Sequence, residues 1–242
     1  MWSWEAFFTF LSSESLLRGA WTTIWLTVVT MVVGLVVGLV LALMRSSRSR
    51  SIRAVANSYI WLFRGTPLLV QLIIIYTGLP QLGIKFGPIQ AALLGLALNE
   101  AAYLSEIVRS GIMSVPRGQF EAARALGMKP VTVMRVVVLP QAFRVMIPPL
   151  GNSLNGLLKT TTLVSIIAVE ELLRLTQYAV QLNFRVLEGL VAAACYYLVM
   201  TSVWTLLQGR LEALVNRSHG TGTAKRPNHQ VPQSAELVGE TR

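Results

Sequence analysis

The sequence contains no aspartate, so all eleven of its acidic residues are glutamates, and Asp-held Mg²⁺ sites and most phosphoryl-transfer machinery are not expected. The two histidines, His219 and His229, both lie in a polar C-terminal segment, which argues against a histidine-based metal or catalytic site. The single cysteine, Cys195, has no partner for an internal disulfide and lies in an apolar run, as a small buried hydrophobe does. We therefore expect no metal site, no catalytic residue and no enzymatic activity.

Charge is also scarce, at 13% of residues, whereas an average soluble domain has roughly a quarter. Hydrophobic residues make up 53% of the chain. Uncharged runs cover 19–44, 65–84 and 189–209, and each reaches the roughly 20 residues that a helix needs to cross a bilayer. The sequence therefore predicts an integral membrane protein with at least three spans.

Two further apolar segments, 86–110 and 145–169, contain polar and ionisable residues. These residues are Asn99, Glu100, Glu106 and Arg109 in the first segment, and Asn152, Asn155, Lys159 and a threonine run in the second. Ionisable groups at membrane depth normally face a protein interior or a watery path, so we interpret both segments as inner spans. The alternative is that Glu106 and Arg109 mark the interfacial end of a helix.

The predicted fold is therefore all-α and polytopic, with about five transmembrane helices. Their approximate ranges are 20–44, 60–81, 88–110, 143–168 and 188–209. Lysine and arginine gather after the first span, between the third and fourth, and after the fifth, which places the C-terminus in the cytoplasm and the N-terminus outside. Residues 1–17 form a short external segment, 18–212 the membrane domain, and 213–242 a polar tail that we expect to be cytoplasmic and disordered.

The loop at 114–140 predicts a short surface helix over 116–128. Pro116 suits the first turn of a helix, and Gly127 suits a left-handed C-cap. Three apolar side chains recur at helical spacing, at Phe120, Ala123 and Leu126. A slim helix of this kind fits a groove in another protein, and resting on lipid headgroups is the alternative.

The same loop carries the strongest resemblance in the chain. Glu121-Ala122-Ala123, then Gly127, then Leu139-Pro140 is similar to the signature loop of ABC importer membrane subunits, with Val137 where that family has isoleucine. Further matches resemble the polar amino-acid uptake branch, which includes histidine, glutamine and arginine permeases. They are Arg64-Gly65-Thr66-Pro67, Ala102-Tyr103, and Lys159 with Thr161-Thr162-Leu163.

The resemblance implies a type I importer transmembrane domain in a multi-pass subunit of the cell inner membrane. It implies import of polar amino acids, or of relatives such as opines, by alternating access. The implied partners are a second permease subunit, identical or paralogous, two ATP-binding subunits and an external solute-binding protein. ATP and Mg²⁺ would be bound by the ATPase subunits, in agreement with the absence of a phosphate-binding Gly-x-x-x-x-Gly-Lys-[Ser/Thr] loop here. Residues 116–128 would be the coupling helix.

A substrate pathway is predicted between the third and fourth spans. Asn99, Tyr103 and Glu106 share one helix face. The fourth span offers Lys159, Thr161, Thr162 and Ser165. Two alternatives stay open: Glu106 pairs with Arg109 at i+3, and the threonine hydroxyls return to their own helix backbone. A proton-coupled transporter or channel that uses Glu100 and Glu106 is the alternative function. Gly34 and Gly38 form a GxxxG pair that predicts a close helix contact.

Overall fold

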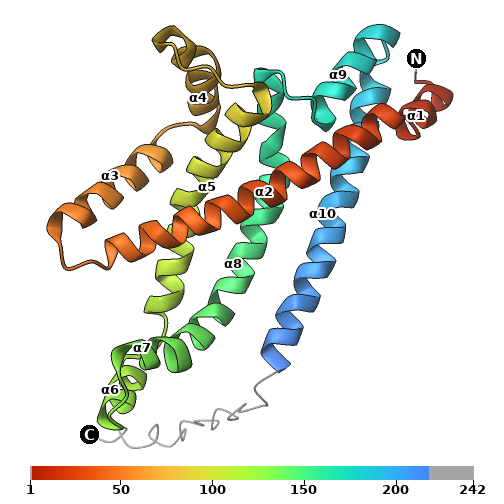
Figure 1. Ribbon diagram of the computed structural model, residues 1–242. Coiled ribbons are helices and arrows are strands. Elements are labelled where there is room, and N and C mark those ends of the chain that lie inside the picture. The colour runs from red at the N-terminus through yellow and green to blue at the C-terminus, as the bar shows by residue number, and fades with distance from the viewer. Residues whose placement is uncertain (1, 218–242) are drawn as a thin grey trace, which may run out of the picture.

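The computed structural model describes residues 2–217, and within that range the chain forms helices and no strands (Figure 1). The helices are α1 (Trp4–Leu11), α2 (Glu14–Arg45), α3 (Arg50–Gly65), α4 (Leu68–Ile73), η1 (Ile74–Gly78), η2 (Leu79–Leu82), α5 (Pro88–Met113), α6 (Arg117–Ala125), α7 (Pro130–Thr132), η3 (Val133–Val138), α8 (Leu139–Thr160), η4 (Thr161–Ile167), α9 (Leu172–Asn183) and α10 (Val186–Arg217).

Four helical segments are long and apolar enough to cross a membrane: α2, α5, the run Pro130–Ile167 that centres on α8, and α10. The fifth candidate is a pair bent by 102°, Arg50–Gly65 followed by Leu68–Leu82. An all-α fold with about five spans is therefore confirmed.

The second span differs in shape from the expected single helix over 60–81. The helix ends at Gly65, and a new one begins at Leu68 in another direction. Thr66 is extended, with φ −118° and ψ 145°, because the ring of Pro67 disfavours the helical conformation in the residue before it. An average of hydropathy along the chain does not detect this break, because the segments on both sides of it are apolar.

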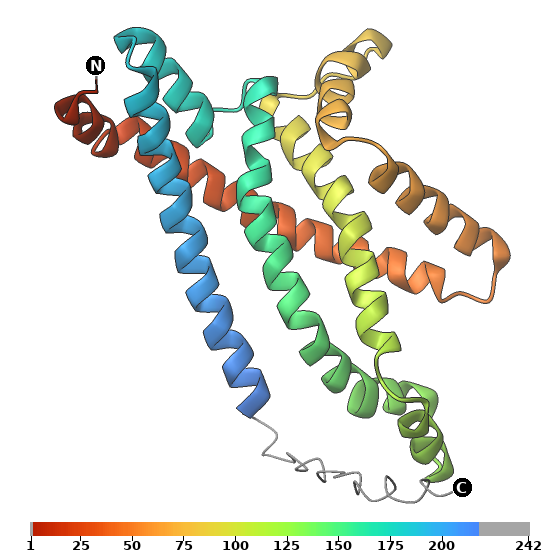
Figure 2. The same ribbon diagram turned by 180° about the vertical axis from the view of Figure 1, so that it is seen from behind.

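The long helix α2 crosses α5 and α8 on one side of the molecule (Figures 1 and 2). Gly38 makes the approach to α5 possible: a Cβ there would lie 3.0 Å from both the Ala101 carbonyl oxygen and the Ser105 nitrogen. One turn earlier, Gly34 faces the aliphatic part of Glu100. The GxxxG pair thus mediates a helix contact within the chain.

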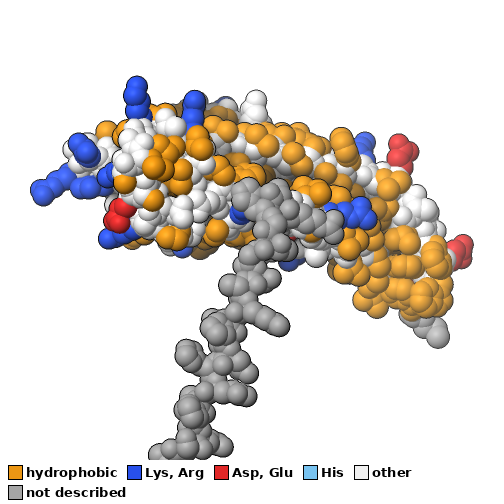
Figure 3. All heavy atoms as spheres, turned by 90° about the horizontal axis from the view of Figure 1, so that it is seen from below, with side chains coloured by type: hydrophobic (Ala, Val, Ile, Leu, Met, Phe, Trp, Pro, Cys, Tyr) orange, Lys and Arg blue, Asp and Glu red, His pale blue; other side chains and the backbone are white. Residues whose placement is uncertain are grey.

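Burial agrees with the expectation that two segments are inner spans. Within the most apolar stretch of α5, 61% of residues are buried. In the second segment, 145–169, most residues are buried or partly buried, because α8 packs against both α5 and α10, and the exposed positions include Val145 and Ile166. Hydrophobic side chains cover much of the surface seen from below (Figure 3).

Both ends of the described chain are more helical than expected. Residues 4–11 form α1, which packs on α10 through the buried Phe10 and through a hydrogen bond from the Ser3 nitrogen to Glu188 (3.0 Å). The predicted tail begins too early at 213, because α10 continues to Arg217. The remainder of that predicted tail, 218–242, lies outside the described residues.

Candidate functional site

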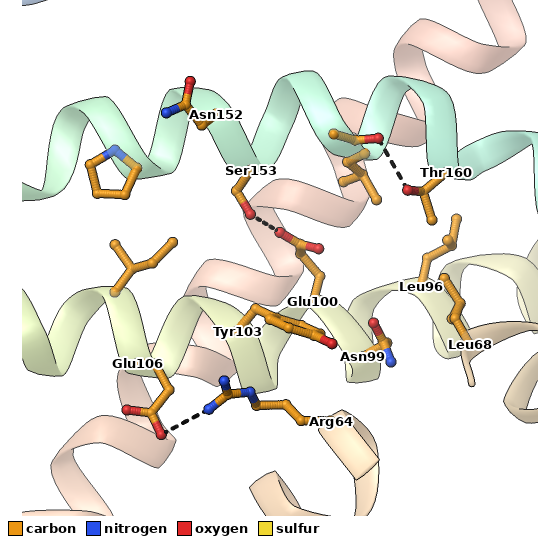
Figure 4. A pocket seen from close by; sticks show the side chains of 14 residues that line it. Arg64, Leu68, Leu96, Asn99, Glu100, Tyr103, Glu106, Asn152, Ser153 and Thr160 are labelled. Atoms are coloured by element: carbon orange, nitrogen blue, oxygen red, sulfur yellow. Dashed lines mark hydrogen bonds and ion pairs between the residues drawn. The ribbon is translucent and has the colours of Figure 1, made fainter. Parts of the chain in front are cut away.

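A cavity of about 630 Å³ lies between α5 and α8, close to the end of α3 (Figure 4). Its size is typical of small-molecule sites. Three residues predicted from the sequence, Asn99, Tyr103 and Glu106, line it together. The other polar or charged residues in its wall are Arg64, Glu100, Asn152, Ser153 and Thr160.

Glu106 forms the charged edge of the cavity together with two arginines. Its Oε1 lies 2.6 Å from Nη1 of Arg45, at the end of α2, and 3.3 Å from Nη1 of Arg64, at the end of α3. The Arg64 guanidinium also lies 5.3 Å from the centre of the Tyr103 ring, a cation–π distance. The alternative in which Glu106 pairs with Arg109 is wrong, because arginines from two other helices pair with the carboxylate.

Glu100 provides the second charge of the cavity. Its carboxylate accepts a hydrogen bond from the Ser153 hydroxyl on α8, and Figure 4 shows this bond crossing between the two helices. None of the ion pairs found between residues 2 and 217 includes Glu100. The cavity wall thus holds the Glu100 carboxylate, which is not in these ion pairs. On the other side of Tyr103 it holds Arg64, which shares the Glu106 carboxylate with Arg45 (Figure 4).

Asn99 has a structural task at the break of the second span. Its amide nitrogen donates to the Phe63 carbonyl (3.0 Å) and to the Gln71 side-chain oxygen (3.1 Å). Gln71 in turn donates to the carbonyls of Phe63 (3.0 Å) and Thr66 (3.1 Å). Backbone carbonyls freed by a break at membrane depth need such partners. The family-typical run Arg64 to Pro67 is therefore the bend itself, braced from α4 and α5.

The other predicted pathway residues do not line this cavity. Lys159 is exposed on another face of α8. The hydroxyls of Thr161, Thr162 and Ser165 return to backbone carbonyls three residues earlier, at 2.7–2.8 Å, because the chain tightens there into the 3₁₀ helix η4. The alternative in which these hydroxyls bond their own helix is therefore correct.

The lining residues on α8 that sequence reasoning missed carry a recognisable signal. Asn152, Gly156 and Thr160 recur at i, i+4 and i+8, so they form one polar or small face of the helix. Ser153 lies beside this face. A helical projection of 145–160 identifies the stripe without a structure.

The signature loop folds as the sequence predicts, although its helix is shorter. Within the expected range 116–128, α6 runs from Arg117 to Ala125. Gly127 has a φ of +74°, its nitrogen bonds the Arg124 carbonyl (2.9 Å), and the Met128 nitrogen bonds the Ala123 carbonyl (3.1 Å). This is the Schellman pattern of helix termination.

The two faces of α6 differ in their environment. The half-buried Phe120 and the buried Ala123 pack with Val133 and Val138 of η3. The opposite side presents the exposed side chains of Glu121 and Ala122, and Leu126 is 82% exposed. Of the three residues in the predicted apolar edge, Phe120 and Ala123 therefore pack inward, whereas Leu126 is exposed. The remaining signature residues, Leu139 and Pro140, begin α8, where a proline is tolerated.

A helical membrane protein with a cavity that contains charged side chains between two of its spans, and with a short surface helix packed on η3, has the features of a transport component. Residues 34–217 match the model of one family, described as the binding-protein-dependent transport system inner membrane component. The chain belongs to this family and is a permease component. A proton-coupled mechanism with Glu100 and Glu106 is accordingly not favoured.

Curated relatives and solved structures agree with this assignment. The arginine transport system permease protein ArgU of Corynebacterium glutamicum is 40% identical over 227 residues, which cover 86% of this chain and 71% of the relative. The L-cystine transport system permease protein TcyB of Bacillus subtilis is 41% identical over 176 residues, covering 72% and 75%.

Among solved structures, an amino acid ABC transporter determined with histidines has a TM-score of 0.79 at 40% identity, covering 83% of this chain and 94% of that one. A structure of the MetNI methionine transporter shares the fold, with a TM-score of 0.71 at 22% identity. The match covers 84% of this chain and 99% of that one.

Proposed function

We propose that the chain is the membrane-spanning subunit of an ATP-driven importer that carries polar amino acids into the cytoplasm by alternating access. Membership of the binding-protein-dependent family supports the importer class. The names of the relatives, for arginine and L-cystine, and a solved amino acid ABC transporter at 40% identity support the substrate class. The solute passes through the cavity between α5 and α8.

The observation that carries the substrate proposal is the pair of opposite charges in the cavity wall. An amino acid has a carboxylate and an ammonium group. Arg64, which shares its anion with Arg45, offers a cation to the carboxylate, and Glu100, which accepts a hydrogen bond from the neutral Ser153 hydroxyl, offers an anion to the ammonium. Two of the pathway residues predicted from the sequence, Glu106 and Lys159, are not assigned to this pair, because Glu106 already pairs with arginines and Lys159 is not in this cavity wall.

The coupling proposal uses the two-sided environment of α6. Phe120 and Ala123 attach the helix to η3, so a push on its exposed side is transmitted to α8. That exposed side, with Glu121 and Leu126, docks into an ATPase subunit, which binds the ATP and Mg²⁺. Closure of two such subunits on ATP moves the helices as rigid bodies between inward-open and outward-open states.

The remaining partners follow from the same proposal. A second permease subunit, identical or paralogous, covers the exposed face of α8. An external solute-binding protein delivers the amino acid on the side of α1 and α9. The arginine-rich ends of α2 and α6 lie in the cytoplasm, with the N-terminus outside.

Substitutions in the loop test the coupling. We expect Glu121→Lys and Gly127→Val each to abolish solute-stimulated ATP hydrolysis in reconstituted vesicles, while the protein stays in the membrane. Valine is strained at a φ of +74°, whereas asparagine tolerates this region, so Gly127→Asn is the matched control and retains stimulation. Normal stimulated hydrolysis in both test variants contradicts the proposal.

Substitution of the cavity carboxylate tests the pathway. A hydrogen bond to a charged group contributes about 1.5–3 kcal/mol, so Glu100→Gln is expected to lower amino acid uptake by roughly ten- to a hundredfold. Glu170→Gln removes the same charge from an exposed position outside the cavity and leaves uptake unchanged. Equal uptake by the two variants in proteoliposomes contradicts the role of Glu100.

A further inference from the structure

The turn between α2 and α3 carries a concentrated positive charge, most of which lies outside the cavity. Four arginines fall within nine residues, from Arg45 to Arg53. The first is held by Glu106 at 2.6 Å. The other three, Arg48, Arg50 and Arg53, are exposed and take part in none of the ion pairs formed by the described chain. Figure 3 shows Lys and Arg side chains gathered at this end of the molecule.

The helix that contains Arg50 and Arg53, α3, is amphipathic and also exposes apolar side chains. Ile52 and Val55, one turn apart, are 43% and 61% exposed, and Leu62 continues their row two turns later. Arg50 and Arg53, also one turn apart, are exposed on the opposite side of the helix. An amphipathic helix with an apolar row on one side and arginines on the other fits the boundary between acyl chains and headgroups.

We propose that the α2–α3 turn, defined by Arg48, Arg50 and Arg53, is a binding site for the phosphate of an anionic phospholipid headgroup. The guanidinium groups donate paired hydrogen bonds to the phosphate oxygens, and Ile52 and Val55 contact the upper acyl chains. An acidic protein partner would account for the arginines but not for the exposed apolar row of α3, which is part of the second candidate span. A lipid satisfies both.

The occupied site would act on the end of α2. Arg45 lies three residues before Arg48 and ties this end of α2 to Glu106 at the cavity edge. A lipid that holds the turn therefore also holds the orientation of the Arg45 side chain. The inference does not depend on which solute is carried.

The test uses the complete transporter, purified with its partner subunits and titrated with phosphatidylglycerol or phosphatidylcholine, with bound lipid counted by native mass spectrometry. Each arginine near an anionic surface contributes about fivefold in affinity, so the triple variant Arg48→Gln, Arg50→Gln, Arg53→Gln is expected to bind phosphatidylglycerol on the order of a hundredfold more weakly. Binding of phosphatidylcholine is expected to stay the same in both proteins.

A matched triple variant removes equal charge from exposed positions away from the turn. The substitutions are Arg18→Gln, Lys85→Gln and Arg210→Gln. Retained phosphatidylglycerol binding in this control, with loss in the turn variant, supports the site. Equal loss in both variants means that net charge alone attracts the lipid, and it overturns the proposal.

Two further arms separate other sources of the anion. Inorganic phosphate at 50-fold excess over the lipid is expected not to displace phosphatidylglycerol, because it lacks acyl chains for Ile52 and Val55. Full displacement identifies a free-anion site and overturns the lipid assignment. Loss of an ATPase subunit from the turn variant with unchanged lipid binding assigns the arginines to a protein contact, and it also overturns the proposal.

Discussion

Removal of the Glu171 side chain is expected to loosen α9 from α10. This carboxylate is fully buried and accepts hydrogen bonds from the backbone nitrogens of Leu173 (3.0 Å) and Arg174 (2.8 Å), which begin α9. It also accepts one from the Tyr197 hydroxyl of α10 (2.8 Å). One side chain therefore caps a helix and joins it to another.

The magnitude follows from these contacts. Loss of an N-cap costs about 1 kcal/mol, and a buried hydroxyl left without its acceptor costs about 1–3 kcal/mol. Relief of the buried charge offsets part of this, because burial raises the pKa of Glu171 and so disfavours its ionised form. We expect Glu171→Ala to lower the free energy of unfolding by about 2 kcal/mol.

The assay is thermal unfolding of the complete purified transporter in detergent, where such a loss corresponds to a fall of about 4–8 °C for a chain of this size. Glu170→Ala is the matched control. The Glu170 side chain, next to Glu171 in the sequence, is exposed, so its removal costs about 0.5 kcal/mol or less. Equal melting temperatures for the two variants refute the role given to Glu171.

The pH dependence of the same group has a defined sign. A carboxyl whose pKa is higher in the folded than in the unfolded state takes up a proton on folding, so its contribution to stability falls as pH rises above the ordinary value of 4.5. The melting temperature of the unmodified protein is therefore expected to fall, relative to that of Glu171→Gln, as pH rises from about 4.5 through the raised pKa. A constant difference across this range contradicts the assignment.

Three other substitutions have expected outcomes. Gly38→Ala is expected to separate α2 from α5 and lower the melting temperature. Gly209→Ala is the control and is expected to be neutral or stabilising, because a Cβ there would meet open space. Equal changes of melting temperature in the two variants are evidence against the close contact at Gly38. Glu106→Gln is expected to cost only about 1 kcal/mol, because its partners are partly exposed, and a loss of 3 kcal/mol in denaturant titrations would contradict this. Gly127→Ala is expected to cost about 1–2 kcal/mol through its left-handed conformation, which unfolding of the detergent-purified chain measures.

Much of the fold was predictable because membrane insertion imposes a simple length rule. Runs without charge located α2 and α10, and polar residues within an apolar run identified α5 as the buried helix. The break at Thr66 was not recognised because hydropathy averages over it. The sequence contains the signal, since Pro67 restricts the residue before it, but the composition on both sides favours one continuous span.

The site was predictable only where it depended on a single helix. Helical periodicity places Asn99, Tyr103 and Glu106 on one face of α5, and all three line the cavity. Contacts between helices are different, because nothing in local spacing indicates that Arg45 or Arg64 reaches Glu106 from 61 or 42 residues away. The failure at Lys159 has a similar origin: helix rotation depends on packing, and here it directs that side chain away from the cavity.

The bend in the second span has a consequence for how the protein enters the membrane. The α3 segment has 16 residues and a polar first turn, and the helical segments after the break are shorter still, so neither half is long enough to cross alone. The carbonyl of Phe63 is satisfied in part by Asn99, which is synthesised later, as part of α5. The second span therefore completes its hydrogen bonds only after the third has packed against it.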